Sequence, residues 1–241
     1  MAAKQLLKNK VAVITGGSRG IGFALARTLA ENGCRVVITG RNTRNLKAAA
    51  TKLSGSKGKV ETVGCDVSDP VQVENLFAGV QKRHSTIDIL INNAGVAHSL
   101  EPIEKLSIDV WKQVIDTNLT GMFLCTRAAL LLMRTGATVV NNLSVAATQP
   151  FPGMAAYNAS KYGALGFTRV LREEVRKRGI RVLALIVGAT DTDIWNHFWP
   201  EAPRAKMVSP ATIAEAVLQA VMLPENTTIE EIRLGPTAGV L

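Results

Sequence analysis

The sequence predicts an α/β protein built on a Rossmann-type, doubly wound parallel sheet of about seven strands, with helices on both faces. Short apolar runs of strand length alternate with longer segments of helical period along the whole chain. Several of these runs are apolar at every position, as in parallel strands whose two faces are both covered. A glycine-rich turn also joins the first strand directly to the first helix. Together these features indicate repeated strand–helix units.

The elements are expected in a regular order. Gly33 is placed to end the first helix, while Asp69 with Pro70 and Ser209 with Pro210 are placed to begin two later helices. No linker, repeat or low-complexity tract divides the chain, so residues 1–241 are expected to form a single domain. Strands are predicted at 11–14, 35–39, 60–64, 88–92, 138–143, 181–187 and 229–234, and helices at 21–31, 45–53, 71–80, 110–133, 155–178 and 210–222.

Composition and charge narrow the class of protein. The chain is 47% hydrophobic and has no long uncharged stretch or leader-like start, so neither a membrane span nor secretion is expected. Cys34, Cys65 and Cys125 are an odd set without metal-like spacing, which predicts reduced core thiols in a cytoplasmic protein. Residues 1–60 hold 12 lysines and arginines against one acid, Glu31, a local excess of +11 in a chain of net charge +9. This excess suits a soluble surface, a phosphate-rich ligand or an acidic partner.

The glycine-rich turn predicts a phosphate site. Thr15-Gly16-Gly17-Ser18-Arg19-Gly20-Ile21-Gly22 follows the first strand and opens into a helix. Glycine allows a tight turn and a close backbone approach, and the helix N-terminus adds partial positive charge for a pyrophosphate. The strand–turn–helix context favours nucleotide binding over a merely structural turn.

The end of the second strand favours NADP(H) over NAD(H). A carboxylate there would bind the adenosine ribose of NAD(H) and repel a 2′-phosphate. The strand instead ends Thr39-Gly40-Arg41-Asn42, and Arg19 lies in the glycine turn. Two guanidinium groups suit a 2′-phosphate through charge-assisted hydrogen bonds. The alternative is that both are solvated surface arginines.

Four polar residues form a candidate catalytic set. Tyr157 and Lys161 share a helix face because they lie four residues apart, and a nearby ammonium group would lower the high pKa of a tyrosine. Ser144, just past a strand, is placed to hold a carbonyl oxygen. Asn118, in the helix after the fourth strand, is placed to orient a water molecule next to Lys161. Alone, a tyrosine and lysine at this spacing are usually an ordinary helix surface, and the other two residues favour catalysis.

From about Lys10 to Leu234 the chain resembles the short-chain dehydrogenase/reductase family. The resemblance is carried by T-G-x-x-x-G-x-G, by Asn92-Asn93-Ala94-Gly95, and by Asn118, Ser144, Tyr157 and Lys161, which match the family tetrad residue by residue. The chain departs from the family pattern at two places: Leu143 stands where the family often has a serine, and Val187-Gly188 stands where it usually has Pro-Gly. The resemblance and the motifs together imply these cofactor contacts: Gly16, Ser18, Arg19, Gly20, Ile21, Gly22, Arg41, Asp66, Val67, Asn93, Ala94, Gly95, Tyr157, Lys161, Gly188, Thr190 and Thr192.

The resemblance also places a substrate lid at about residues 190–209. Trp195, Phe198 and Trp199 in this lid, with Met154 ahead of Tyr157, are the expected substrate-lining residues and favour an apolar or aromatic substrate. The alternative is that the lid aromatics pack onto the body or onto a neighbouring subunit. Phe151 is a candidate for the opposite wall. His98 lies near the same mouth or, as we expect, faces solvent.

The sequence therefore predicts an NADP(H)-dependent oxidoreductase that interconverts a carbonyl and a secondary alcohol on a small molecule. A 3-oxoacyl-[acyl-carrier-protein] reductase is the alternative enzyme, and a non-catalytic NADP(H) sensor is the alternative of another class. The three histidines have no ligand spacing, so no metal is expected. No nucleic-acid module is found, and the resemblance implies a homo-oligomer, a tetramer or a dimer.

Overall fold

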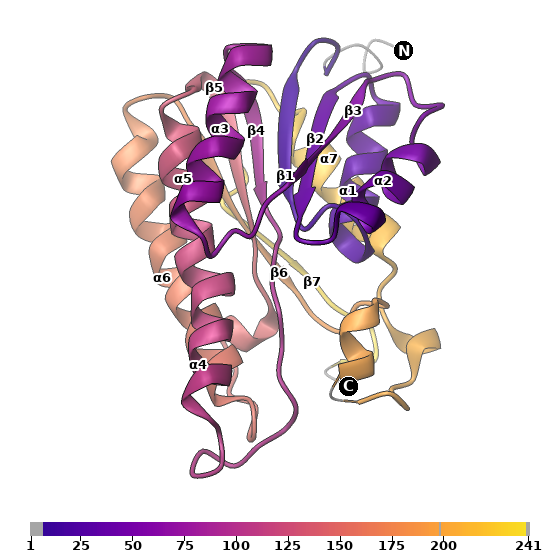
Figure 1. Ribbon diagram of the computed structural model, residues 1–241, viewed down its shortest axis with the longest axis vertical. Coiled ribbons are helices and arrows are strands. Elements are labelled where there is room, and N and C mark those ends of the chain that lie inside the picture. The colour runs from indigo at the N-terminus through magenta and orange to yellow at the C-terminus, as the bar shows by residue number, and fades with distance from the viewer. Residues whose placement is uncertain (1–6, 198, 240–241) are drawn as a thin grey trace.

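The computed structural model describes residues 7–197 and 199–239, and its seven strands join one parallel sheet (Figure 1). The strand order is β3-β2-β1-β4-β5-β6-β7, which confirms the predicted doubly wound fold. The strands are β1 (Val11–Thr15), β2 (Arg35–Gly40), β3 (Val60–Gly64), β4 (Ile87–Asn92), β5 (Met133–Asn142), β6 (Arg181–Val187) and β7 (Glu231–Leu234).

Helices cover both faces of the sheet. One apolar core packs α1, α2 and α7 on one face, and a second packs α3, α5 and α6 on the other. In β1, Ile14 joins the first core and Val13 the second, so successive apolar residues serve opposite layers. The helices are α1 (Gly20–Glu31), α2 (Thr43–Lys52), α3 (Pro70–His84), α4 (Ile108–Ile115), α5 (Gly121–Leu130), α6 (Ala155–Arg176) and α7 (Pro210–Val221).

Capping residues begin and end the helices largely where the sequence predicts. The Asp69 carboxylate accepts hydrogen bonds from the first turn of α3, and the Ser209 hydroxyl caps α7. Gly33 has a φ of +90° just past α1, a backbone conformation that suits glycine. Most boundaries therefore fall within about two residues of their predicted places.

The predicted helix at 110–133 is wrong as a continuous element. A π-helical turn, Asp116–Thr120, separates α4 from α5, and α5 ends at Leu130. The apolar residue Met133 instead begins β5, where it pairs with Ile87 of β4. A short apolar run has the same sequence pattern in a buried helix and in a buried strand. Here the pairing with β4 makes the run that begins at Met133 a strand.

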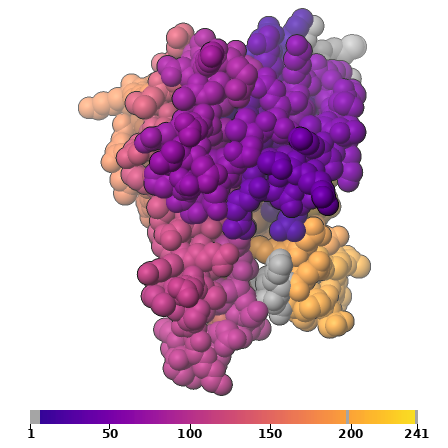
Figure 2. Space-filling view, viewed as in Figure 1, coloured from indigo at the N-terminus to yellow at the C-terminus, as the bar shows by residue number. Residues whose placement is uncertain are grey.

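The carboxyl ends of β1, β4 and β5 meet at one edge of the sheet. Because β1 lies between β2 and β4, the chain leaves this edge toward opposite faces on the two sides, which creates a crevice. Two segments lie beyond this edge in Figures 1 and 2: the loop and helix around residues 95–120, and the segment between β6 and α7. Within the described residues, no helix is long and apolar enough to cross a membrane.

Candidate active site

The glycine turn forms a cradle between β1 and α1. Gly16 and Gly20 have positive φ angles of 64° and 55°. A Cβ atom on Gly22 would overlap the Gly16 carbonyl oxygen, and one on Gly17 would lie 2.7 Å from Ile38. No side chain caps the first turn of α1, which also carries no acidic residue. The backbone N–H groups at this helix start therefore remain available to an anion, which fits a pyrophosphate.

Thr15 joins the cradle to the Asn-Asn-Ala-Gly segment. Its hydroxyl oxygen accepts hydrogen bonds from the backbone N–H groups of Asn93 and Ala94, both at 2.9 Å. The Asn93 side chain then donates to the carbonyls of Thr15 and Gly16 at 2.9 and 3.1 Å. Two loops far apart in sequence thus become one rigid wall of the crevice.

The two arginines expected at a 2′-phosphate each lie near a different carboxylate. Arg19 lies 3.7 Å from Asp193, in the segment after β6. Arg41 lies 4.0 Å from Asp66, at the end of β3. All four side chains are solvent-accessible, so these surface pairs are weak and exchangeable.

The other predicted cofactor residues line the same edge. The Asp66 carboxylate is held by the Ser68 backbone and hydroxyl, and Val67 is buried. Across the crevice, the Thr192 methyl group lies 3.1 Å from where a Gly20 Cβ would stand. The remaining residues sit in the glycine turn (Ser18, Ile21), after β4 (Gly95) and after β6 (Gly188, Thr190).

Tyr157 and Lys161 lie on one face of α6 in its first two turns. The Lys161 ammonium lies 5.6 Å from the centre of the Tyr157 ring and donates a hydrogen bond to the Asn142 carbonyl at 3.1 Å. Lys161 is only 6% exposed. The pair is therefore held against the end of β5, beside the glycine cradle.

Burial controls the ionisation of both groups. Burial lowers the pKa of Lys161 to about 8, because the charged amine loses water. Burial also raises the pKa of Tyr157, and the hydrogen bond with Ser144 opposes that rise. The pKa of Tyr157 is thus raised overall, contrary to the expected lowering, because desolvation outweighs the interactions that favour the tyrosinate.

Ser144 is positioned by the loop that precedes α6. Its hydroxyl caps a short 3-10 turn by accepting from the Ala146 N–H at 3.1 Å, and it also bonds to Tyr157. Asn158 braces the same loop, donating to the carbonyls of Ala146 and Gln149 at 2.8 and 2.7 Å. The serine and tyrosine hydroxyls therefore face one point, as a carbonyl oxygen would require.

Asn118 lies in the π-helical turn, a distortion often found at functional sites. Its side chain accepts from the Val96 N–H at 2.8 Å and donates to the Val96 carbonyl at 2.9 Å and to Ser160 at 3.1 Å. The side-chain amide thus fixes the chain after Gly95.

The predicted lid consists of two short 3-10 turns between β6 and α7. The Trp195 indole N–H donates to the Thr190 carbonyl at 2.8 Å, and the Trp199 ring meets the Trp195 ring edge to face at 6.0 Å. Arg204 braces this segment through Asp191 and Asn196. Trp199 remains 39% exposed. Phe198 lies outside the described residues.

One expectation at the substrate end needs correction. His98 does not face solvent, because it is 7% exposed and its Nδ1 lies 2.7 Å from the Ser99 carbonyl. Phe151 lines a cavity of about 310 Å³ with Ile103 and Tyr162, and this cavity includes none of the four candidate catalytic residues. Met154 is buried at the start of α6.

Sequence reasoning missed three residues that assemble the site. Thr15 joins the loops after β1 and β4, and Asn158 shapes the loop that carries Ser144. Asn142 accepts from Lys161 through its carbonyl and donates from its side chain to Asn93 at 2.9 Å. For Thr15 and Asn142 the available signal was a polar residue at the end of an otherwise apolar strand, whereas Asn158 gave no such signal.

The doubly wound parallel sheet and the glycine cradle at its carboxyl edge define a dinucleotide-binding α/β protein. Residues 10–202 match the family model described as short chain dehydrogenase. The chain is 38% identical to a 3beta-hydroxysteroid dehydrogenase of Mediterraneibacter gnavus over 77% of this chain and 67% of that protein. It is 33% identical to a 3-oxoacyl-[acyl-carrier-protein] reductase of Synechocystis over 88% of each chain. A metagenomic short-chain oxidoreductase in complex with NADP matches with a TM-score of 0.85 and 30% identity, covering 97% of this chain and 99% of that one.

The chain therefore belongs to the short-chain dehydrogenase/reductase family and is an NAD(P)-dependent oxidoreductase.

Proposed function

We propose that the protein is an NADP(H)-dependent reductase or dehydrogenase that interconverts a carbonyl and a secondary alcohol on a small molecule. The observation that carries this proposal is the convergence of Ser144, Tyr157 and buried Lys161 at the sheet edge that also holds the glycine cradle. Proton-transfer groups thus lie next to a site built for a dinucleotide.

When bound, NADP(H) supplies or accepts the hydride. In the reductive direction, Tyr157 donates a proton to the carbonyl oxygen while the Ser144 hydroxyl donates a hydrogen bond that stabilises the growing negative charge. In the oxidative direction, Tyr157 accepts the alcohol proton. Lys161 stabilises the tyrosinate that each reductive cycle leaves, and Asn118 keeps the Val96 segment in place beside them.

NADP(H) is favoured over NAD(H) by the cations at the adenosine end of the cradle. Arg19 and Arg41 each have only a weak, exposed carboxylate partner, which a 2′-phosphate can replace. The metagenomic relative in complex with NADP supports the same choice.

For the substrate, we propose a small molecule with apolar or aromatic substituents, held beneath a lid at residues 190–209. Exposed Trp199 supports this, whereas the bonded indole of Trp195 favours a packing role for that ring. A carrier-linked 3-oxoacyl substrate is the second candidate, favoured by the Synechocystis relative. A non-catalytic sensor is disfavoured because all four candidate catalytic residues are present.

We also propose a homo-oligomer in a reducing, cytoplasmic compartment. Cys34, Cys65 and Cys125 are buried and unpaired, as expected where thiols stay reduced. Large apolar side chains stand exposed along α4, α5 and α6, which supports a subunit contact there: Ile108, Trp111, Phe123, Tyr162 and Val170.

The test is consumption of NADPH across a carbonyl panel of aryl ketones, diketones, quinones, sugars and an acetoacetyl thioester. We expect turnover with NADPH to exceed turnover with NADH, and Tyr157→Phe to lower it by about 10²- to 10⁴-fold. Rates on acyl-carrier thioesters far above those on free ketones would select the carrier-linked substrate. Binding of NADPH without turnover on any carbonyl would instead support the sensor.

A further inference from the structure

Most cations in the described part of the amino-terminal third have no ion-pair partner there. Among the described residues of this third, three cations lie within 4.0 Å of a carboxylate, namely Lys10, Arg19 and Arg41. The others are exposed, and none of them forms an ion pair within the part of the chain that the structure describes. We call these eight cations, on α1, on α2 and at the amino ends of β1 to β3, the unpaired basic face: Lys8, Arg27, Arg35, Arg44, Lys47, Lys52, Lys57 and Lys59.

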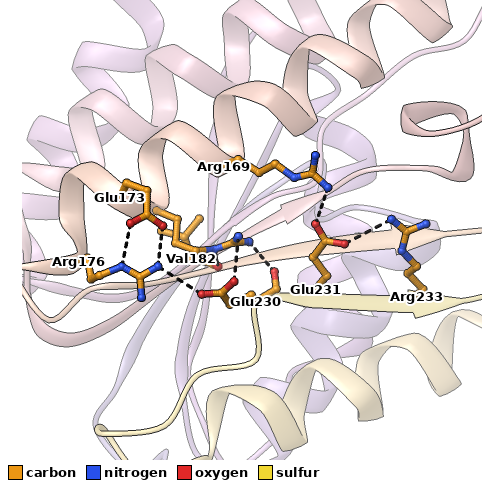
Figure 3. A network of polar contacts seen from close by, with 8 residues as sticks. Arg169, Glu173, Arg176, Val182, Glu230, Glu231 and Arg233 are labelled. Carbon is orange, nitrogen blue, oxygen red and sulfur yellow. Dashed lines mark hydrogen bonds and ion pairs between the residues drawn. The ribbon is translucent and has the colours of Figure 1, made fainter.

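The arginines at the other end of the sheet are arranged differently. Figure 3 shows Arg169 and Arg176 of α6 turned toward carboxylates at the start of β7. Arg172, on the same helix, pairs with Glu230 as well. Glu230 alone lies within 3.4 Å of two of these guanidinium groups. These arginine charges are largely neutralised by the neighbouring carboxylates. This end of the sheet therefore carries no positive potential comparable to that of the unpaired basic face.

The unpaired basic face begins at the cofactor edge. α2 starts just after β2, beside Arg41, and runs back toward the amino ends of the strands. With a rise of about 1.5 Å per residue, Lys47 lies roughly 8 Å and Lys52 roughly 15 Å along the helix from its cap at Asn42. The Debye length is about 8–10 Å at physiological salt. Lys47 can therefore act on an anion at this edge in the cell, while Lys52 acts mainly at low salt.

We propose that the unpaired basic face is an electrostatic funnel that draws NADP(H) to the adenosine end of the cradle and sets its association rate. This rests on the proposed function. The 2′-phosphate adds about −1.5 to −2 of charge to the pyrophosphate that NAD(H) also carries, so the field favours NADP(H) in rate as well as in affinity. The pairs of Arg19 with Asp193 and of Arg41 with Asp66 supply the contacts that exchange once the anion arrives.

A small anion fits this face better than a nucleic acid. The first sixty residues contain a single aromatic residue, Phe23, whose ring lies under the Arg27 guanidinium. Single-stranded nucleic acids are usually held by several stacking aromatic side chains. The face thus offers charge without a stacking platform.

The experiment measures NADPH association and dissociation by stopped-flow fluorescence at increasing salt. Lys47→Glu/Lys52→Glu reverses two charges on the face, and the matched control Lys82→Glu/Lys177→Glu reverses two exposed charges on α3 and after α6. We expect the first variant to lower the association rate by about three- to tenfold at low salt, with an unchanged dissociation rate. The loss should shrink to less than about twofold at 0.5 M salt, because screening removes long-range attraction. Single variants should rank Lys47 above Lys52, and NADH should respond less than NADPH.

Equal association rates for the two double variants would overturn the proposal, as would a loss that appears only in the dissociation rate. Duplex DNA bound at physiological salt and not displaced by NADPH would assign the face to nucleic acid and overturn it as well. Wild-type binding of NADPH at high salt separates the two ideas. If NADPH does not bind there at all, the proposed cofactor has failed, whereas normal binding with salt-independent association rates removes only the funnel.

Discussion

The two halves of α6 carry their cations in opposite ways. Near its amino end, Lys161 is buried with a carbonyl and an aromatic ring beside it, and no carboxylate among the described residues forms an ion pair with it. Near its carboxyl end, Arg172 is also buried, but it bonds to the Val182 and Glu230 carbonyls and pairs with the Glu230 carboxylate at 3.3 Å. One helix thus holds an uncompensated charge at the candidate site and compensated charges at the fold's edge. A desolvated charge left unpaired at one site, while charges elsewhere are paired, is the pattern expected of a functional residue.

The largest expected effect comes from removing the proton donor at the amino end. Tyr157→Phe keeps the ring but loses the hydroxyl, so turnover should fall by about 10²- to 10⁴-fold while NADPH still binds. Steady-state rates and cofactor titration measure the two effects. Retained turnover would place the acid–base group elsewhere.

The next largest effect is expected at the carboxyl-terminal half of α6, where Arg172 has a carboxylate partner. Arg172→Met leaves two backbone carbonyls short of a donor and Glu230 without its buried partner, so the free energy of unfolding should fall by about 2–4 kcal/mol. Urea unfolding measures this loss. NADPH turnover per folded molecule should stay near wild type, because the residue lies away from the sheet edge. A stability loss below about 0.5 kcal/mol would show that the network contributes little to the free energy of unfolding.

Removing the unpaired charge of Lys161 should change the free energy of unfolding in the opposite direction. Lys161→Met should stop turnover yet raise the free energy of unfolding of the cofactor-free protein by about 1–3 kcal/mol, because it removes a desolvated amine. The lysine pKa falls from 10.5 to about 8 on folding. Between these values the unfolded chain binds more protons, so wild-type stability should rise with pH across that window. The variant should lose this rise, and unfolding curves from pH 7 to 10 test it. A destabilised variant with an unchanged pH slope would contradict the comparison.

The smallest effect is expected at the exposed pair in the same network. Arg169 is half exposed and lies 3.0 Å from Glu231. Exposed ion pairs contribute roughly 0–1 kcal/mol, so Arg169→Met should change stability by less than about 0.5 kcal/mol in the same urea experiment. An effect as large as that of Arg172→Met would mean that burial is not what separates the two arginines.

Much of the fold followed from local pattern. The alternation of apolar runs with helical segments predicted the parallel sheet, and caps such as Asp69 and Ser209 marked helix starts, because both signals act over a few residues. The glycine turn was recognisable because its spacing is itself the constraint: a side chain at Gly22 would collide with Gly16. Tyr157 and Lys161 share a face by helix geometry alone.

Other features depend on contacts between segments far apart in sequence. The end of the long predicted helix at Leu130 came from β5 pairing with β4, and the burial of His98 came from the packing of its loop. Asn142 bridges Lys161 and Asn93 only because the ends of β4 and β5 meet beside α6. The pKa of Tyr157 was misjudged because charge proximity is visible in the sequence, whereas desolvation depends on everything that packs around the ring. The sequence by itself thus determined which groups are present and on which elements they lie. Tertiary structure decided which of them touch and how much water reaches them, because packing and solvation are properties of the assembled fold.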